Sequence, residues 1–170
     1  MGGHRKIQMP ALTALYREMG LLRPTSYIQS GNVVFDTRRR FSASKLGLRL
    51  EEAILEKFGF EVRVLVLTVE EMKRALAANP FLKLKGIHPE KLYITFLFEE
   101  PSRDGWQDIT AGKDSSDIFA VTGRLVYLYV PGGYGKTPLT NHFFEVKLGM
   151  AATTRNWRTA NMLMEMAASR

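Results

Sequence analysis

The sequence predicts an α+β fold, and three observations lead to this prediction. Segments with apolar residues at helical spacing alternate with short β-branched and aromatic runs along the chain. Two of those runs flank the Thr-Gly pair at residues 122–123, which is a signal for an antiparallel hairpin. Several helices together with a hairpin favour a mixed β-sheet with helices packed on one side over a purely parallel sheet.

The composition allows one domain or two small interlocked halves. The chain has 170 residues, of which 45% are hydrophobic, enough to supply a packed core. It contains no apolar run of the roughly 18 residues that a membrane span needs, and its first residues lack the apolar centre of a signal peptide. We therefore expect a cytoplasmic protein with no membrane contact. The absence of cysteine excludes disulfides, thiolate metal ligands and cysteine nucleophiles.

The first third of the chain predicts a helix and an interrupted strand. Residues 10–19 place apolar residues on one helical face, with Pro10 in the first turn and Gly20 after the last. Residues 27–35 are strand-like at both ends. The Ser-Gly-Asn sequence in their middle predicts a bulge or a close approach of another backbone.

A second helix follows, and then a strand. Ser42 or Ser44 is expected to cap this helix, which runs to Phe58 and ends at Gly59. Residues 61–67 then predict a buried strand because they are rich in valine and leucine.

A capping box marks the start of the third helix. The Thr68 side chain can accept from the backbone of Glu71 while Glu71 reaches back, and the helix must end before an Asn-Pro pair. Residues 91–98 predict a strand that is apolar on both faces. Residues 101–116 are glycine- and serine-containing and predict a surface connection with one short helical turn.

The last third predicts the hairpin, two helices and a short strand. Residues 118–121 and 124–130 are the hairpin strands. A helix over residues 138–148, closed by glycine, leads into a short strand, and residues 157–168 form the last helix.

The densest polar cluster lies where that short strand meets the last helix. Asn156 is a good helix N-cap because its side-chain oxygen can accept from free helical N–H groups. Arg155 and Arg158 flank Trp157, so the guanidinium groups can bind a phosphate or carboxylate while the indole stacks on a base. The same residues can instead anchor the last helix, and we expect Trp157 to be largely buried on its core side.

A second candidate is the glycine-rich turn at residues 133–137, which lies between a strand and a helix. Glycine amides with Lys136 can hold an anion. A Walker loop needs glycine where Val130 stands, and Pro138 removes an amide that such a loop would use. The turn therefore predicts a weaker anion site, or no site at all.

These two clusters are expected to be neighbours, because only one short helix separates them in the chain. If the strand returns to the N-terminal end of that helix, Arg155 and Lys136 converge on one anion. The alternative places Arg155 far from Lys136 and pairs it with a carboxylate such as Glu145.

A third candidate is the polar group Gln29, Ser30 and Asn32. Ser30 does not sit in a nucleophile elbow, because Ile28 and Asn32 occupy the places of the required glycines. These side chains either satisfy backbone groups at the bulge or bind the polar edge of a ligand. Of the histidines, only His142 has a carboxylate at helical spacing, so no metal site or cofactor is predicted.

Several stretches together resemble one bacterial family, called domain of unknown function 1697. The two most specific are residues 25–35 and residues 152–159; the others are residues 58–62, 79–81, 91–93 and 133–136. The resemblance implies a single α+β domain over residues 1–170, built of ferredoxin-like halves at about residues 1–80 and 81–170. It implies no activity and no catalytic residue.

Members of this family usually begin with an apolar strand that ends in a glycine-rich turn, whereas this chain begins at that turn. The first strand is therefore expected to be missing. The cause is a start codon assigned too late, a truncation, or a protein that leaves a neighbouring strand with an unpaired edge. In the last case, the edge favours pairing with another chain and a homo-oligomer.

Three functions remain open from the sequence. The net charge of +7 favours an anionic partner, either nucleic acid or a phosphorylated small molecule, although the tight run Arg38-Arg39-Arg40 is expected to be a solvated loop. The leading prediction is a binding module for such a partner. The others are an enzyme with a polar pocket built from residues 27–32 and 153–158, and a structural or oligomerising protein.

Overall fold

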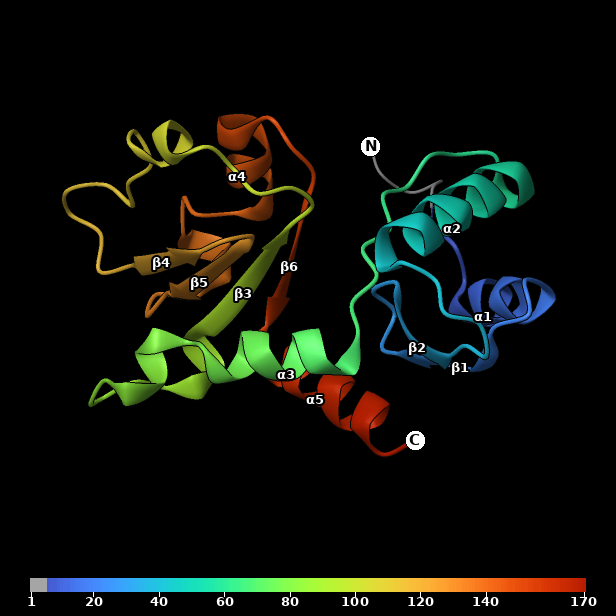
Figure 1. Cartoon of the computed structure of the whole chain (residues 1–170). Coiled ribbons are helices and arrows are strands. Elements are labelled where there is room, and N and C mark those ends of the chain that lie inside the picture. Colours follow the sequence, from blue (N-terminus) through green and yellow to red (C-terminus); the bar gives the residue numbers. More distant parts are fainter. Residues whose placement is uncertain (1–5) are drawn as a thin grey trace. The chain divides into compact units, whose positions relative to one another are not determined.

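The computed structural model describes residues 6–170, which belong to two compact units (Figure 1). Unit 1 consists of Met1–Val69 and Leu163–Arg170, and unit 2 consists of Glu70–Met162. The division falls near residue 70, and the end of the chain belongs to the first unit. The expected glycine-rich turn at residues 1–3 and His4 lie outside the described residues.

Unit 1 contains two helices and a two-stranded antiparallel sheet. These elements are α1 (Met9–Glu18), β1 (Leu22–Tyr27), β2 (Asn32–Asp36) and α2 (Ala43–Phe58). The predicted interrupted strand over residues 27–35 is wrong: residues 28–31 form a hairpin turn, closed by the pairing of Tyr27 with Asn32. Gly31 has a φ of 77°, a value that glycine adopts without strain.

The strand β1 was not predicted because Pro24 lies within it and has no N–H for a ladder. The structure accommodates this proline through a shift of register between Leu22 and Thr25. The helix α2 begins and ends where its local signals predicted. The Ser42 hydroxyl accepts from the N–H of Lys45 at 3.2 Å, and Gly59 ends the helix in the left-handed conformation.

The core of unit 1 lies between α1 and α2. Its buried side chains are Met9, Leu12, Leu15, Tyr16, Leu21, Leu46, Leu50 and Ile54. Val62, Val64 and Val66 pack against this core from residues 61–67. The predicted strand over residues 61–67 is wrong, because among the described residues no strand pairs with it. Instead the N–H of Val64 donates to the carboxylate of Glu51 at 2.8 Å.

Burial of Tyr16 gives unit 1 a dependence on alkaline pH. Burial raises the pKa of Tyr16 from 10.0 to about 12. Because the folded state holds this proton more tightly than the unfolded state, its contribution to stability is complete below pH 10 and is lost as the pH rises towards 12. Two pKa units correspond to about 2.7 kcal/mol. Between pH 10 and pH 12, we expect the free energy of unfolding to fall less in Tyr16→Phe than in the wild type. Urea denaturation at several pH values measures this difference. Parallel pH profiles of the two proteins would contradict this account.

Unit 2 is built on a four-stranded sheet with the strand order β4-β5-β3-β6. The strands are β3 (Leu92–Leu97), β4 (Ile118–Thr122), β5 (Leu125–Tyr129) and β6 (Ala152–Asn156). Every pairing among them is antiparallel, and β4 and β5 form the predicted hairpin. The α+β class is therefore confirmed, with antiparallel sheets in place of the expected mixed sheet.

The helices of this part of the chain are α3 (Val69–Ala77), α4 (Asn141–Leu148) and α5 (Trp157–Ala168). The single-turn helices are Pro80–Lys83, Pro89–Lys91, Arg103–Trp106 and Tyr134–Lys136. Within residues 6–170, no helix has the length and apolar character needed to cross a membrane.

Helices cover both faces of the four-stranded sheet, whereas the sequence predicted helices on one side only. Figure 1 shows α4 on one face and α3 on the other. On the α4 face, Leu97 and Leu128 join Phe144 in one buried cluster. On the opposite face, the Tyr127 hydroxyl donates to the carbonyl of Ala75 in α3 at 2.6 Å. Alternation of side chains along each strand separates the two layers.

Candidate functional site

The glycine-rich turn and the short strand β6 are joined by a chain of hydrogen bonds. The hydroxyl of Tyr134 accepts from the backbone N–H of Asn141, at the start of α4, at 2.7 Å. The side chain of Asn141 donates to the carbonyl of Ala152 at 2.9 Å and accepts from the hydroxyl of Thr154 at 3.0 Å. The Thr154 hydroxyl also lies 2.7 Å from that of Thr95 in β3. The turn and the strand-to-helix junction are therefore neighbours.

The side chain of Arg155 lies on the face of the sheet opposite α4. Thr154 points towards α4, and Arg155 follows it in the strand, so its side chain points the opposite way. Its guanidinium donates to the hydroxyl of Thr153 at 2.8 Å and to the carbonyl of Thr154 at 2.9 Å. Burial lowers its pKa from the usual value. The pleat of β6 directs Arg155 away from the α4 face, which Tyr134 contacts through Asn141. The expected convergence of Arg155 with Lys136 on one anion at the start of α4 is therefore not supported.

The carboxylate of Glu145, the alternative partner considered for Arg155, accepts from the backbone N–H of Ala152 at 3.1 Å. This contact ties the end of α4 to the start of β6. Glu145 thus takes part in positioning the strand that carries the junction.

The remaining junction residues begin the last helix. The side chain of Asn156 accepts from the N–H of Thr159 at 2.8 Å, which confirms the predicted N-cap. Trp157 has intermediate exposure, so the expectation of a largely buried ring stays a prediction. Arg158 is exposed in the first turn of α5.

Aromatic and cationic side chains gather beside the glycine-rich turn. The rings of Tyr93 and Tyr134 are stacked, with centroids 4.8 Å apart and an angle of 26° between their planes. The ammonium group of Lys91 lies 4.0 Å from the position that a Cβ on Gly133 would take. Lys136 follows Tyr134 in the same single-turn helix and is exposed. We call Lys91, Tyr93, Tyr134 and Lys136 the tyrosine–lysine corner.

The junction reaches this corner through the sheet. Asn156 is the partner of Tyr93 in the pairing of β6 with β3, so α5 begins next to the stacked rings. Sequence reasoning selected Lys136 but missed Lys91 and Tyr93. They are 40 or more residues from the turn, and only the pairing of β3 with β5 and β6 brings them there.

The third predicted group forms hydrogen bonds within unit 1. Gln29 donates to the carbonyl of Ile7 at 3.0 Å, and Asn32 donates to the hydroxyl of Ser30 and to the carbonyl of Tyr27. These side chains belong to unit 1, whereas the junction belongs to unit 2. Over residues 6–170, no cluster of histidine and acidic residues is suited to hold a metal ion.

Comparison with solved structures shows the same fold in a conserved bacterial protein from Streptococcus pneumoniae. The two proteins share 20% sequence identity with a TM-score of 0.75, over 98% of this chain and 92% of the other. No curated protein matches the chain. Residues 1–127 match the family described as "Protein of unknown function (DUF1697)", and this chain belongs to that family.

Proposed function

We propose that this protein binds a partner that carries a phosphate beside an aromatic ring, such as a nucleotide or the end of a nucleic acid. The observation that supports the proposal is the stacked pair Tyr93 and Tyr134 with Lys91 and Lys136 beside it. Both rings are partly exposed. A base stacked on such a ring contributes about 1–3 kcal/mol to binding.

The two lysines supply the charge that the phosphate needs. Neither Lys91 nor Lys136 forms an ion pair within residues 6–170. Gly133 has a φ of 91°, which a residue with a Cβ rarely adopts, and a Cβ there would lie in contact with Lys91. The backbone conformation of the turn therefore favours glycine at this position, and the ammonium group of Lys91 lies beside it. Arg158, exposed in the first turn of α5, adds a further cation to the same end of the sheet.

The corner is not a triphosphate loop. Val130 and Pro138 stand at positions where that loop uses a glycine and a backbone amide. The helix α4 begins only at Asn141, and one of its first amides already donates to Tyr134. The expected ligand is therefore held by side chains and by stacking.

The test is a titration of inorganic phosphate, mononucleotides and a short single-stranded DNA. We expect Lys91→Gln combined with Lys136→Gln to weaken nucleotide binding at least about tenfold, which corresponds to 1.4 kcal/mol. These two substitutions do not alter the stacked rings or the hydrogen bond of Tyr134. Lys83→Gln with Lys113→Gln removes the same charge from exposed positions elsewhere in unit 2 and should bind as the wild type does. The proposal fails if the wild type binds none of these ligands or if the two double variants behave alike.

We also infer that unit 2 is a ferredoxin-like half. Its strands, numbered within the unit, follow the antiparallel order 2-3-1-4. The enzyme alternative requires residues 27–32 and 153–158 in one pocket. The hydrogen bonds of Gln29 and Asn32, which go to Ile7, Tyr27 and Ser30, supply no support for it.

A further inference from the structure

Unit 1 carries an uncompensated run of positive charge between β2 and the first turns of α2. Residues 37–50 contain no acidic residue, and their five cations are Arg38, Arg39, Arg40, Lys45 and Arg49. All five are exposed. We call this segment the basic run. Unit 1 holds 12 lysines and arginines against 7 acidic residues, whereas unit 2 holds 12 against 10. Most of the excess charge therefore belongs to unit 1.

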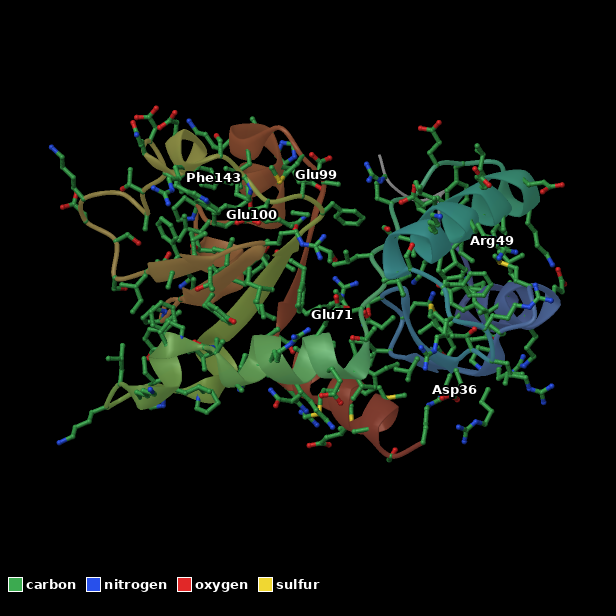
Figure 2. All side chains as sticks on the ribbon, viewed as in Figure 1. Asp36, Arg49, Glu71, Glu99, Glu100 and Phe143 are labelled. Atoms are coloured by element: carbon green, nitrogen blue, oxygen red, sulfur yellow. The ribbon has the colours of Figure 1, made fainter. Side chains whose placement is uncertain are left out.

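The carboxylates at the two ends of the basic run are already engaged. Asp36, just before it, pairs with Arg23 and with Arg170, each at 2.9 Å. Glu51, just after it, accepts from Arg63 at 3.1 Å and from the N–H of Val64 at 2.8 Å. Figure 2 shows Asp36 beside the hairpin and Arg49 beside α2. Within residues 6–170, none of the five cations of the basic run forms an ion pair.

The backbone of the basic run is held in place. The Thr37 hydroxyl accepts from the N–H of Arg39 at 3.3 Å and donates to its carbonyl at 3.0 Å, which fixes a turn. The guanidinium of Arg49 lies over the ring of Phe41, 5.2 Å from its centre. Lys45 and Arg49 are four residues apart and share one face of α2. The cations therefore extend over a fixed loop and two helical turns.

We propose that the basic run is a docking surface for the phosphate backbone of a nucleic acid. Cations spread over a loop and a helix face match a series of phosphates better than one small anion. An anionic membrane is the weaker candidate, because surface binding by a helix needs an apolar face beside the cations. The apolar face of α2 is buried in the core through Leu46, Leu50 and Ile54, and Leu48 is an isolated exposed leucine. Contacts to phosphates read no bases, so binding is expected to be independent of sequence.

The test measures the affinity of the full chain for a labelled single-stranded DNA, a duplex DNA and an RNA at several salt concentrations. Each phosphate neutralised on duplex DNA adds about 0.9 to the slope of log affinity against log salt, and about 0.7 on a single strand. We expect the triple variant Arg38→Gln, Arg39→Gln, Arg40→Gln to bind at least about tenfold more weakly at low salt. Its slope should be shallower by about 2–3.

Two controls separate this surface from net charge and from the tyrosine–lysine corner. Lys83→Gln, Lys85→Gln, Lys113→Gln removes three exposed cations from unit 2 and should keep both the affinity and the slope. The arginine variant should keep the mononucleotide affinity of the wild type, because the two surfaces lie in different units. Circular dichroism melting checks that each variant folds.

Three results would overturn the proposal. The first is a wild type that binds none of the three nucleic acids. The second is an equal loss of affinity in the two triple variants, which would show an effect of net charge alone. The third is binding to vesicles of anionic lipid that the arginine variant loses while nucleic-acid binding stays unchanged, which would assign the surface to a membrane.

Discussion

Replacing Phe144 by alanine is expected to lower the free energy of unfolding of unit 2 by about 3–5 kcal/mol. Phe144 is fully buried on the α4 face of the sheet. Its ring lies 5.4 Å from that of Phe143 and 6.3 Å from those of Trp106 and Phe119. The truncated side chain leaves a cavity, and three aromatic neighbours cannot all move to fill it.

Urea denaturation followed by tryptophan fluorescence measures this effect, because Trp106 is a direct neighbour of Phe144. Phe144→Leu is the matched control: it keeps most of the volume and should cost less than about 1.5 kcal/mol. If alanine and leucine at this position were equally stable, the cluster would not be closely packed.

Gly47→Val is expected to destabilise unit 1 by about 3 kcal/mol. Gly47 lies inside α2, where alanine in place of glycine normally adds up to about 1 kcal/mol of stability. Here a Cβ would lie 2.8 Å from the carbonyl oxygen of Val64 and 3.8 Å from a methyl of Val66. Because the first of these atoms is backbone, residues 61–67 must move away from α2 for the side chain to fit. That movement pulls the three valines of this segment from the core.

Thermal denaturation of Gly47→Val and Gly47→Ala tests this close approach. Leu48→Val is the control for the β-branched side chain, since Leu48 is 56% exposed in the same helix. Its cost should be only about 0.5 kcal/mol. A higher melting temperature for Gly47→Ala than for the wild type would show that the segment yields easily and would contradict the expected loss.

The two binding proposals make separate predictions because they use different chemistry in different units. The tyrosine–lysine corner offers stacking and two lysines, and its ligand should show a modest dependence on salt. The basic run offers only charge, so the affinity for its ligand should depend steeply on salt concentration. The outcome of one measurement therefore does not determine the outcome of the other.

Local chemistry in the sequence was sufficient to predict most helix boundaries. Ser42 and Asn156 are N-caps because an oxygen close to the backbone can accept from a free helical N–H, whatever surrounds the helix. Gly59 and Gly149 end helices because they adopt the left-handed conformation without strain. The β4–β5 hairpin was equally predictable, since its turn and its strands adjoin in the chain.

Strand partners and the direction of side chains depended on the tertiary structure. The valines of residues 61–67 reach the core as a buried strand would, yet their hydrogen bonding involves a glutamate of α2. Only one short helix separates Lys136 from the strand that carries Arg155, but the alternation of side chains along β6 directs Arg155 away from the α4 face. Conversely, Tyr93 meets Tyr134 only because β3 pairs with β5 and β6, two strands that come much later in the chain. A cap needs only the residues next to it, whereas a pairing is a choice among distant segments with similar β-propensity, and it is decided by how all of them pack together.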